Sequence, residues 1–359
     1  MKVGILTGGG DCPGLNAVIR SVVKSGRAKY NWDVVGIEEG YVGLQNPVKT
    51  RPLTELAIKG ILPTGGTILG AASGISPEKV SKKNNSISGK ADLSKEIHQN
   101  IEKLGISALI AIGGDGTLKI AETLYKKGIP IIGIPKTIDN DIESTDLTFG
   151  FQTAVNTATD ALDKLHTTAA SHHRVIVVEL MGRYAGWIAL EAGIAGGAHV
   201  ILIPEIPFKI ETVSNTIVER YKRGSRSSIV VTAEGAKPIG GEMHVIKRSS
   251  EGYVERLGGI GHKVGEEISR LSSMDVRVTV LGHLQRGGSP TPTDRILATR
   301  FGVAAVNLIA KKQFGEMVCL KGQEISSVSI SEGVHRLKTV PPEGDLVKVA
   351  KALGISLGS

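Results

Sequence analysis

The sequence has few of the features that mark a secreted, membrane-spanning or disulfide-rich protein. Only two cysteines occur in 359 residues, which is too few for a disulfide framework and fits a reducing compartment. No apolar run approaches the roughly 20 residues that span a bilayer, and no signal peptide precedes Val3. We therefore predict a cytoplasmic protein with no membrane partner.

Aromatic residues are also scarce, at 4%, so the core must consist mainly of Ile, Val, Leu and Ala. The net charge of +8 could favour nucleic acid, acidic lipid or anionic metabolites. However, no long Lys/Arg block exists, and the densest basic pair, Lys82–Lys83, is predicted to lie in a solvated loop. Basic residues spread along the chain favour a small, multiply charged substrate and predict no nucleic-acid partner.

Short β-branched runs alternate with helical patterns along the whole chain. The strand candidates lie at 3–7, 108–114, 129–135, 173–182, 199–205, 227–235 and 276–283. Helical patterns follow most of them, at about 15–30, 92–105, 118–127, 151–170, 186–196, 212–223 and 294–312. Strands that are apolar throughout are typical of parallel sheets covered on both faces, so we predict two α/β domains.

Two domains also fit the length of the chain. We place one boundary near Gly150 and predict that the chain returns to the first domain after about residue 264. The first domain is then 1–150 plus about 264–315, the second is 151–263, and 316–359 is an extension packed on the first. The polar segment 76–92 is expected to be a surface loop, and 238–252 a hairpin.

Polar clusters follow the ends of the predicted strands. They are GGGDCPG (8–14), GGDGT (113–117), PKTIDNDI (135–142), MGRY (181–184) and GHLQRGG (282–288). Ligands of open α/β sheets bind at the carboxyl ends of the strands. The shared placement therefore predicts one site, and it carries more weight than any single motif.

Two glycine-rich clusters suit phosphate groups. Glycines let backbone N–H groups approach phosphate oxygens, and a helix N-terminus adds a favourable dipole. The loop 7–16 has this form, although a plain tight turn explains it equally well. Asp115, beside Thr117, could hold Mg²⁺ next to a polyphosphate; the alternative is a turn followed by a helix cap.

The remaining clusters suit phosphoryl transfer. In TIDND, Asp139 or Asp141 could accept a proton from an attacking hydroxyl, or could simply cap the next turn. Arg183 could offset charge on the moving phosphoryl group. Arg174, Arg277 and Arg286 lack acidic neighbours in the pattern and are predicted to contact phosphate. His283 lies in the same polar cluster as Gln285. Cys12 is interpreted as a small filler residue.

Seven segments together resemble the 6-phosphofructokinase family. They are TGGGDCPGLNAVIR, GGTILG, GGDGT, PKTIDND, SHHRVIVVELMGRYAG, AEG and RVTVLGHLQRGGSPTPTDRILA, in matching order and spacing from about residue 2 to 315. The resemblance implies two Rossmann-like domains with the active site in the cleft between them, and a homotetramer. It also implies transfer of a phosphoryl group to the 1-hydroxyl of fructose 6-phosphate.

The resemblance assigns roles to particular residues. Asp139 would be the general base, Thr137 would orient the transferring phosphate, and Arg183 would stabilise it. Asp115 would bind Mg²⁺, with Asp141 reaching the ion through water. The donor would be bound by Gly10, Tyr41, Asp115, Gly116, Thr117 and Lys136. The sugar phosphate would be bound by Thr137, Asp139, Arg174, Met181, Gly182, Arg183, Glu234, Arg277, His283 and Arg286, with Arg174 reaching a neighbouring subunit's site.

The phosphoryl donor is either ATP or pyrophosphate. Gly116 leaves room for an α-phosphate where pyrophosphate-using relatives carry an aspartate, and this favours ATP. Lys136 resembles the pyrophosphate type, and Ser73 and Ile120 depart from the usual nucleotide contacts. ATP is preferred, because a steric restriction is harder to evade than a missing contact. His199, in place of a glutamate in the effector pocket, predicts weak activation by ADP although Arg20 is kept.

Two other functions were considered. NAD kinases and lipid kinases also carry GGDGT, but they lack the TIDND, MGR and GHLQRGG set. A catalytically silent sugar-phosphate-binding subunit is the alternative from a different class, and the complete set of catalytic residues argues against it.

Overall fold

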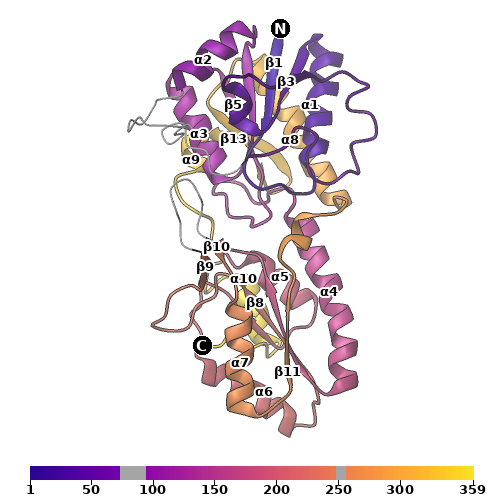
Figure 1. Ribbon diagram of the computed structural model, residues 1–359, viewed down its shortest axis with the longest axis vertical. Helices are drawn as coiled ribbons and strands as arrows, with labels where there is room; N and C mark the ends of the chain where they lie inside the picture. The colour runs from indigo at the N-terminus through magenta and orange to yellow at the C-terminus, as the bar shows by residue number, and fades with distance from the viewer. Residues whose placement is uncertain (73–93, 248–255) are drawn as a thin grey trace.

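The computed structural model describes residues 1–72, 94–247 and 256–359. Figure 1 shows a tall molecule in which a larger sheet with its helices lies above a smaller one. Among the described helices, none has the length and apolarity needed to cross a membrane. Ser73, Lys82–Lys83 and the whole of the predicted loop 76–92 lie outside the described residues.

The upper sheet has seven strands in the order β13-β12-β5-β4-β1-β2-β3. Its parallel strands β1, β2, β4, β5 and β12 are flanked by antiparallel edge strands β3 and β13. Their bounds are β1 Lys2–Thr7, β2 Asp33–Ile37, β3 Thr50–Pro52, β4 Ala108–Gly113, β5 Ile131–Pro135, β12 Glu316–Lys321 and β13 Glu324–Ser329. Every residue of β4 and β5 is buried, which confirms that apolar runs predict strands covered on both faces.

Helices cover both faces of this sheet. One core cluster contains α1 (Leu15–Tyr30) and α8 (Pro292–Ala310), whose side chains pack together. The other contains α2 (Ser94–Lys103), α3 (Asp115–Lys126), the short α9 (Ile330–Gly333) and the 3₁₀ turn η1 (Gly40–Leu44). The two groups lie on opposite sides of the upper sheet in Figure 1.

The lower sheet has four parallel strands in the order β11-β6-β8-β7. They are β6 (Val175–Leu180), β7 (Val200–Leu202), β8 (Ser228–Ala233) and β11 (Val276–Val280). Helices α4 (Phe151–His172) and α5 (Trp187–Ala195) cover one face, while α6 (Ile210–Lys222) and α7 (Ile260–Ser272) cover the other. A small antiparallel pair, β9 (Val245–Lys247) and β10 (Arg256–Leu257), forms the predicted hairpin, with its second strand beyond the predicted range.

Strand pairing differs from the predicted return to the upper unit after about residue 264. β11 instead pairs with β6 in the lower sheet, where it satisfies the backbone hydrogen-bonding groups on the edge of β6 opposite to β8. The chain returns to the upper sheet only after the 3₁₀ turn η2 (Gly282–Arg286), with α8.

The segment 316–359 also differs from its predicted packing on the first domain alone. Its strands β12 and β13 belong to the upper sheet. However, α10 (Asp345–Ala352) contacts α5, and Ser356 forms a parallel bridge with Val200 of β7. The last residues therefore complete the lower unit, where they cover the open edge of β7.

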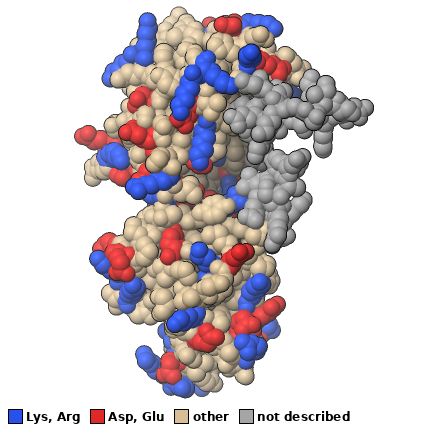
Figure 2. All heavy atoms as spheres, turned by 90° about the vertical axis from the view of Figure 1, so that its left-hand side faces the viewer, with Lys and Arg blue, Asp and Glu red and all other residues tan. Residues whose placement is uncertain are grey.

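The surface is hollowed between the upper and lower parts in Figure 2, and basic and acidic side chains are interspersed on this face. The polar clusters predicted at the strand ends meet at this junction. Arg286, which follows β11, donates from Nη1 to the carbonyl oxygen of Asp11, which follows β1, at 3.2 Å. The carboxyl ends of the two sheets therefore approach each other.

Candidate active site

The glycine loop after β1 is held by two cationic side chains. Lys136 Nζ donates to the carbonyl oxygen of Gly10, and Arg286 contacts the next residue as described above. A Cβ atom at Gly10 would lie 2.3 Å from Nη1 of Arg286, so glycine is required if the guanidinium is to stay there. Lys136 is 3% exposed, and burial lowers the pKa of its amine. The loop thus contributes backbone atoms to a positively charged site.

The two carboxylates of TIDND differ in environment. Asp139 is 8% exposed, and its Oδ1 has no hydrogen-bond partner among the described residues. Burial raises the pKa of Asp139, while the charges of Arg286, Arg183 and Lys136 lower it. Burial also raises the pKa of Asp141, to about 7, helped by the charge of Asp139. A buried carboxylate oxygen without a partner is costly unless a ligand supplies a donor, so this oxygen is free to accept a hydrogen bond from a bound hydroxyl.

Thr137 joins the two carboxylates. Its Oγ1 accepts a hydrogen bond from the backbone N–H of Asp139 at 3.0 Å, and its hydroxyl bonds to Asp141. The hydroxyl of Thr148 donates to the carbonyl oxygen of Thr137 at 2.7 Å. The loop after β5 is therefore held by its own side chains, as a positioned general base requires.

Arg183 and Glu234, both from the lower unit, lie near Asp139. Gly182 has φ of 125°, and a Cβ atom at Gly235 would lie 1.7 Å from the carbonyl oxygen of Arg183. The turns after β6 and β8 therefore touch through their backbones, which only glycine permits. Burial raises the pKa of Glu234 to about 7, with the charge of Asp139 also raising it and that of Arg183 lowering it.

Gln285 is a residue that the sequence analysis noted only as a neighbour of His283. It is fully buried. Its Oε1 accepts a hydrogen bond from Met181 N at 3.3 Å, and its Nε2 donates to Gly282 O at 3.1 Å. Gln285 thereby joins the turn that carries His283 and Arg286 to the turn that carries Arg183. The polar GHLQRGG pattern was the available signal for it.

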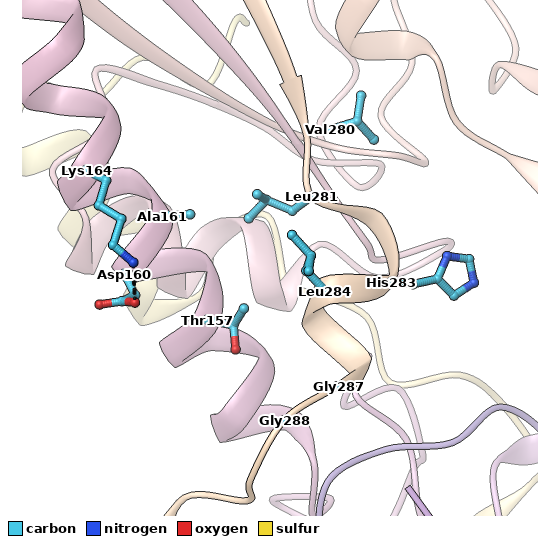
Figure 3. Close-up of a pocket in the computed structure, with 10 residues that line it drawn as sticks. All are labelled: Thr157, Asp160, Ala161, Lys164, Val280, Leu281, His283, Leu284, Gly287 and Gly288. Atoms are coloured by element: carbon cyan, nitrogen blue, oxygen red, sulfur yellow. Dashed lines mark hydrogen bonds and ion pairs between the residues drawn. The ribbon is translucent and has the colours of Figure 1, made fainter. Parts of the chain in front are cut away.

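A groove beside α4 has a volume of about 870 Å³. Figure 3 shows its lining from α4 on one side and from Val280, Leu281 and Leu284 on the other, with the ring of His283 pointing away from α4. No predicted catalytic residue lines it. The groove is therefore distinct from the site around Asp139 and Arg183, and His283 is a predicted sugar-phosphate residue that lines it.

The predicted donor-binding residues lie around the start of α3. Asp115 pairs with Lys119 at 2.8 Å, and a Cβ atom at Gly116 would meet nothing within 4 Å. Thr117 is 7% exposed, and its carbonyl oxygen accepts a hydrogen bond from the hydroxyl of Tyr41 at 3.1 Å. The side chains of Thr117 and Tyr41 are thus buried under the site, while Asp115 and Gly116 border its open part. Burial raises the pKa of Tyr41.

Asp115 and Asp141 are the carboxylates that could hold Mg²⁺ at this site. The described residues contain no group of three or more His, Cys, Asp or Glu side chains placed to hold a metal ion. Mg²⁺ next to a polyphosphate is usually bound by one or two carboxylates together with phosphate oxygens and water. Asp115 and Asp141 fit that pattern, because the charge of Asp115 reaches Asp141 and raises its pKa.

Two predicted substrate-binding residues, Arg174 and Arg277, lie away from Arg183. Arg174 precedes β6 and Arg277 lies near the start of β11, so both are at the amino ends of strands whose carboxyl ends carry the site. Both pair with Asp275, at 2.6 and 2.5 Å. The interpretation of these arginines as lacking acidic neighbours is therefore wrong. A six-residue strand separates its ends by roughly 17–20 Å, so neither reaches Arg183 within one chain.

Glu234 predicts a pH effect on stability. Its pKa in the folded protein, about 7, is above its ordinary value of 4.5, so its contribution to stability is full below pH 4.5 and is lost as pH rises through 7. Glu234→Gln cannot ionise. In thermal unfolding of the unliganded protein, the free energy of unfolding of the variant should therefore rise relative to that of the wild type between pH 5 and 8, by on the order of 1–2 kcal/mol. A pH-independent difference would contradict this account.

Two parallel-sheet units with carboxylates, arginines and a glycine loop at their junction are typical of α/β proteins that bind phosphorylated ligands. The family model described as phosphofructokinase matches residues 2–309. The chain therefore belongs to the phosphofructokinase family, which sets aside the NAD-kinase and lipid-kinase alternative.

Curated relatives carry two kinds of name. The chain is 53% identical over 358 residues to an ATP-dependent 6-phosphofructokinase of Chloroflexus aurantiacus, covering 99% of this chain and 98% of that one. It is 50% identical over 346 residues to a pyrophosphate–fructose 6-phosphate 1-phosphotransferase of Streptomyces coelicolor, covering 95% and 97%.

Solved structures agree on the fold. The chain superimposes on phosphofructokinase from Saccharomyces cerevisiae with a TM-score of 0.76 at 30% identity, covering 93% of this chain and 45% of that one. This chain therefore spans less than half of the yeast chain. A pyrophosphate-dependent phosphofructokinase from Marinobacter aquaeolei gives a TM-score of 0.80 at 22% identity, covering 99% and 88%, and supports the fold alone.

Proposed function

We propose that this protein transfers a phosphoryl group from ATP to the 1-hydroxyl of fructose 6-phosphate, giving fructose 1,6-bisphosphate and ADP in glycolysis. The observation that carries the proposal is the position of Asp139. Its buried, unpartnered Oδ1 lies among the charges of Arg183, Arg286 and Lys136, where the two units meet. A carboxylate in that setting can accept a proton from a substrate hydroxyl.

Each group near Asp139 has a defined task in this reaction. Asp139 takes the proton from the sugar hydroxyl, Thr137 orients the transferring group, and Arg183 offsets the charge that spreads over its oxygens. Bound Mg²⁺, held by Asp115 and reached by Asp141 through water, would neutralise donor phosphate charge. Met181, Gly182, Glu234, His283 and Arg286 would bind the sugar phosphate, and Gly10, Tyr41, Asp115, Gly116, Thr117 and Lys136 the donor.

The placement of Arg174 and Arg277 favours an oligomer. Both lie partly exposed on an edge far from their own chain's Arg183, and Asp275 aligns them. In the proposed homotetramer, Arg174 extends into the sugar-phosphate site of a neighbouring subunit, and Arg277 shares its edge and its direction. We also propose that the upper unit binds the donor, that the lower unit binds the sugar phosphate, and that the enzyme is cytoplasmic.

The donor assignment rests on space. The open position beyond Gly116 leaves room for an α-phosphate and nucleoside. Lys136, held at Gly10 O, is the observation that favours pyrophosphate, since its charge could hold a small donor. ATP remains the proposed donor, with reversible transfer from pyrophosphate as the second candidate.

An assay with each donor tests this choice. Purified protein at matched Mg²⁺ should show a higher kcat/KM with ATP than with pyrophosphate. Gly116→Asp adds bulk and negative charge where the α-phosphate would lie, and should lower kcat/KM for ATP by about 100-fold or more while leaving pyrophosphate use nearly unchanged. A much higher kcat/KM of the wild type with pyrophosphate would overturn the proposed donor.

Weak control by ADP is part of the proposal. Nδ1 of His199 accepts a hydrogen bond from the backbone N–H of Ile229 at 2.9 Å, and burial lowers the pKa of its ring to about 4. Because Nδ1 accepts this hydrogen bond, the proton of the neutral ring lies on Nε2, and neither ring nitrogen offers a free lone pair to replace a glutamate as a ligand of an effector's metal.

A further inference from the structure

The segment 336–340, here called the C-terminal strap, crosses from one unit to the other. It follows α9 on the upper unit and precedes α10 on the lower unit, and Figure 1 shows this yellow part of the chain running down between them. The sequence predicts for this region only packing on the first domain. Its contacts instead reach the loop that carries the two carboxylates of the proposed site.

Lys338 binds the loop that carries Asp139 and Asp141. Its Nζ donates to Asn140 Oδ1 at 2.9 Å and to the carbonyl oxygens of Thr145 at 2.8 Å and Asp146 at 2.9 Å. Its backbone N–H donates to the carbonyl oxygen of Asp141 at 2.9 Å. An ammonium group has three N–H donors, so all three are used on one loop.

Asn140 is the central contact, because it lies between the two carboxylates in sequence. It has a left-handed backbone with φ of 50°, an uncommon conformation for a residue other than glycine. Its Oδ1 also accepts from Thr148 N at 3.1 Å. The ammonium of Lys338 and Thr148 therefore hold Asn140 in place, and with it the directions in which Asp139 and Asp141 leave the chain.

The other end of the strap binds the lower unit beside Arg183. Nε1 of Trp187 donates to the carbonyl oxygen of Lys338 at 3.0 Å, and the indole ring centroid lies 5.8 Å from Nζ. Oε1 of Glu205 accepts from Val340 N at 2.8 Å and from Gly186 N at 2.9 Å. Gly186 and Trp187 lie two and three residues after Tyr184, the last residue of the MGRY turn, so the strap contacts both the loop that carries Asp139 and the segment that follows Arg183.

We propose that Lys338 is a positioning residue for phosphoryl transfer: it holds the Asp139–Asp141 loop in register with the Arg183 turn. The inference rests on the proposed function, because Asp139 and Arg183 must act on the same phosphoryl transfer. Displacing a catalytic group by about 1 Å can reduce turnover by roughly 100-fold. The loss should therefore appear in kcat, while binding of fructose 6-phosphate changes little.

Lys338→Met tests the proposal, with Arg336→Met as the matched control. Arg336 belongs to the same strap and binds the same loop, through an exposed ion pair with Glu143 at 3.2 Å, and exposed pairs contribute little. We expect kcat to fall by about 10- to 100-fold in Lys338→Met, with KM for fructose 6-phosphate within about threefold, and to stay within about twofold in Arg336→Met. Equal effects of the two variants would overturn the proposal.

Chemical rescue separates the ammonium from packing. Both native cysteines, Cys12 and Cys319, are buried, whereas Lys338 is only half-buried, so Lys338→Cys adds the least buried thiol of the three. Alkylation with 2-bromoethylamine forms a C–S bond with loss of bromide and the thiol proton, and restores an ammonium at this position. Iodoacetamide gives an uncharged adduct of similar length. Recovery of kcat with the first reagent only is expected, and equal recovery with both would overturn the role of the charge.

Hydrogen exchange supplies a readout that does not depend on activity. Backbone amides of residues 140–148 should exchange faster in Lys338→Met than in the wild type, and unchanged exchange would contradict the proposal. If the wild type transfers phosphoryl groups from neither donor, the proposed function fails, whereas the exchange result still tests whether Lys338 orders the loop.

Discussion

Asp139→Asn should reduce kcat by about 10²- to 10⁴-fold, the range expected when a general base is lost. The amide keeps the shape of the side chain but cannot take the hydroxyl proton. The side chain of Asp139 is buried close to the charges of Arg183, Arg286 and Lys136, which favour its ionised form, and an amide in this position keeps no basic oxygen. Steady-state kinetics with saturating donor, together with equilibrium binding of fructose 6-phosphate, would measure the two effects separately.

Binding of fructose 6-phosphate should survive this substitution, within a fewfold change in Kd. Asp160→Asn is a suitable control, because Asp160 is exposed on α4 and pairs only with Lys164 in the described structure, at 2.9 Å. A loss of less than tenfold in Asp139→Asn, or about 1.4 kcal/mol, would refute the base assignment. A wild type that binds the sugar phosphate without turnover would instead indicate a silent binding subunit.

Gly235→Ala should remove most activity and also lower thermal stability. The added Cβ would lie 1.7 Å from the carbonyl oxygen of Arg183, and a backbone atom cannot rotate away as a flexible side chain can. The turns after β6 and β8 must separate, which moves Arg183 and Glu234 together. We expect kcat/KM to fall by about 100-fold or more and stability to fall by about 1–3 kcal/mol.

Gly26→Ala is the matched control for that experiment. Gly26 is also buried, but it lies in helix α1, where an added Cβ would be 3.5 Å from the nearest atom, in the ring of Trp32. Alanine is favoured over glycine in a helix by about 1 kcal/mol, so stability should stay or rise and kinetics should not change. If both glycine variants behaved alike, close contact between the two turns would not explain the loss.

Much of the site was predictable because parallel sheets place their carboxyl ends along one edge. The apolar runs ending at Thr7, Gly113 and Pro135 identified three neighbouring strands of the upper sheet, and the structure pairs them in the order β5-β4-β1. The polar residues that follow them must then be close, whatever the details of packing. This is why Asp115, Asp139 and the glycine loop were predicted before their distances were known.

The misplaced parts of the prediction share a cause. β11 was assigned to the wrong unit because local sequence shows a strand but not which exposed edge it will pair with. Arg277 was grouped with Arg286 because they are close in sequence, although one begins β11 and the other follows its end. Asp275 was missed as the partner of Arg174 because their ion pair joins residues 101 positions apart; its pair with Arg277, two positions away, could have been read from the sequence.

The sequence alone determined most of the strands and helices around the site, the family and the chemical types of the groups in the site, because backbone preferences and apolar periodicity act over a few residues. Tertiary structure decided which ends of the two sheets meet, why Oδ1 of Asp139 is left without a partner, and how Lys338 of the strap reaches Asn140, 198 positions earlier. Those features depend on burial and on contacts between distant segments. Neither is encoded in any short stretch of residues; both arise only when the two units close on each other.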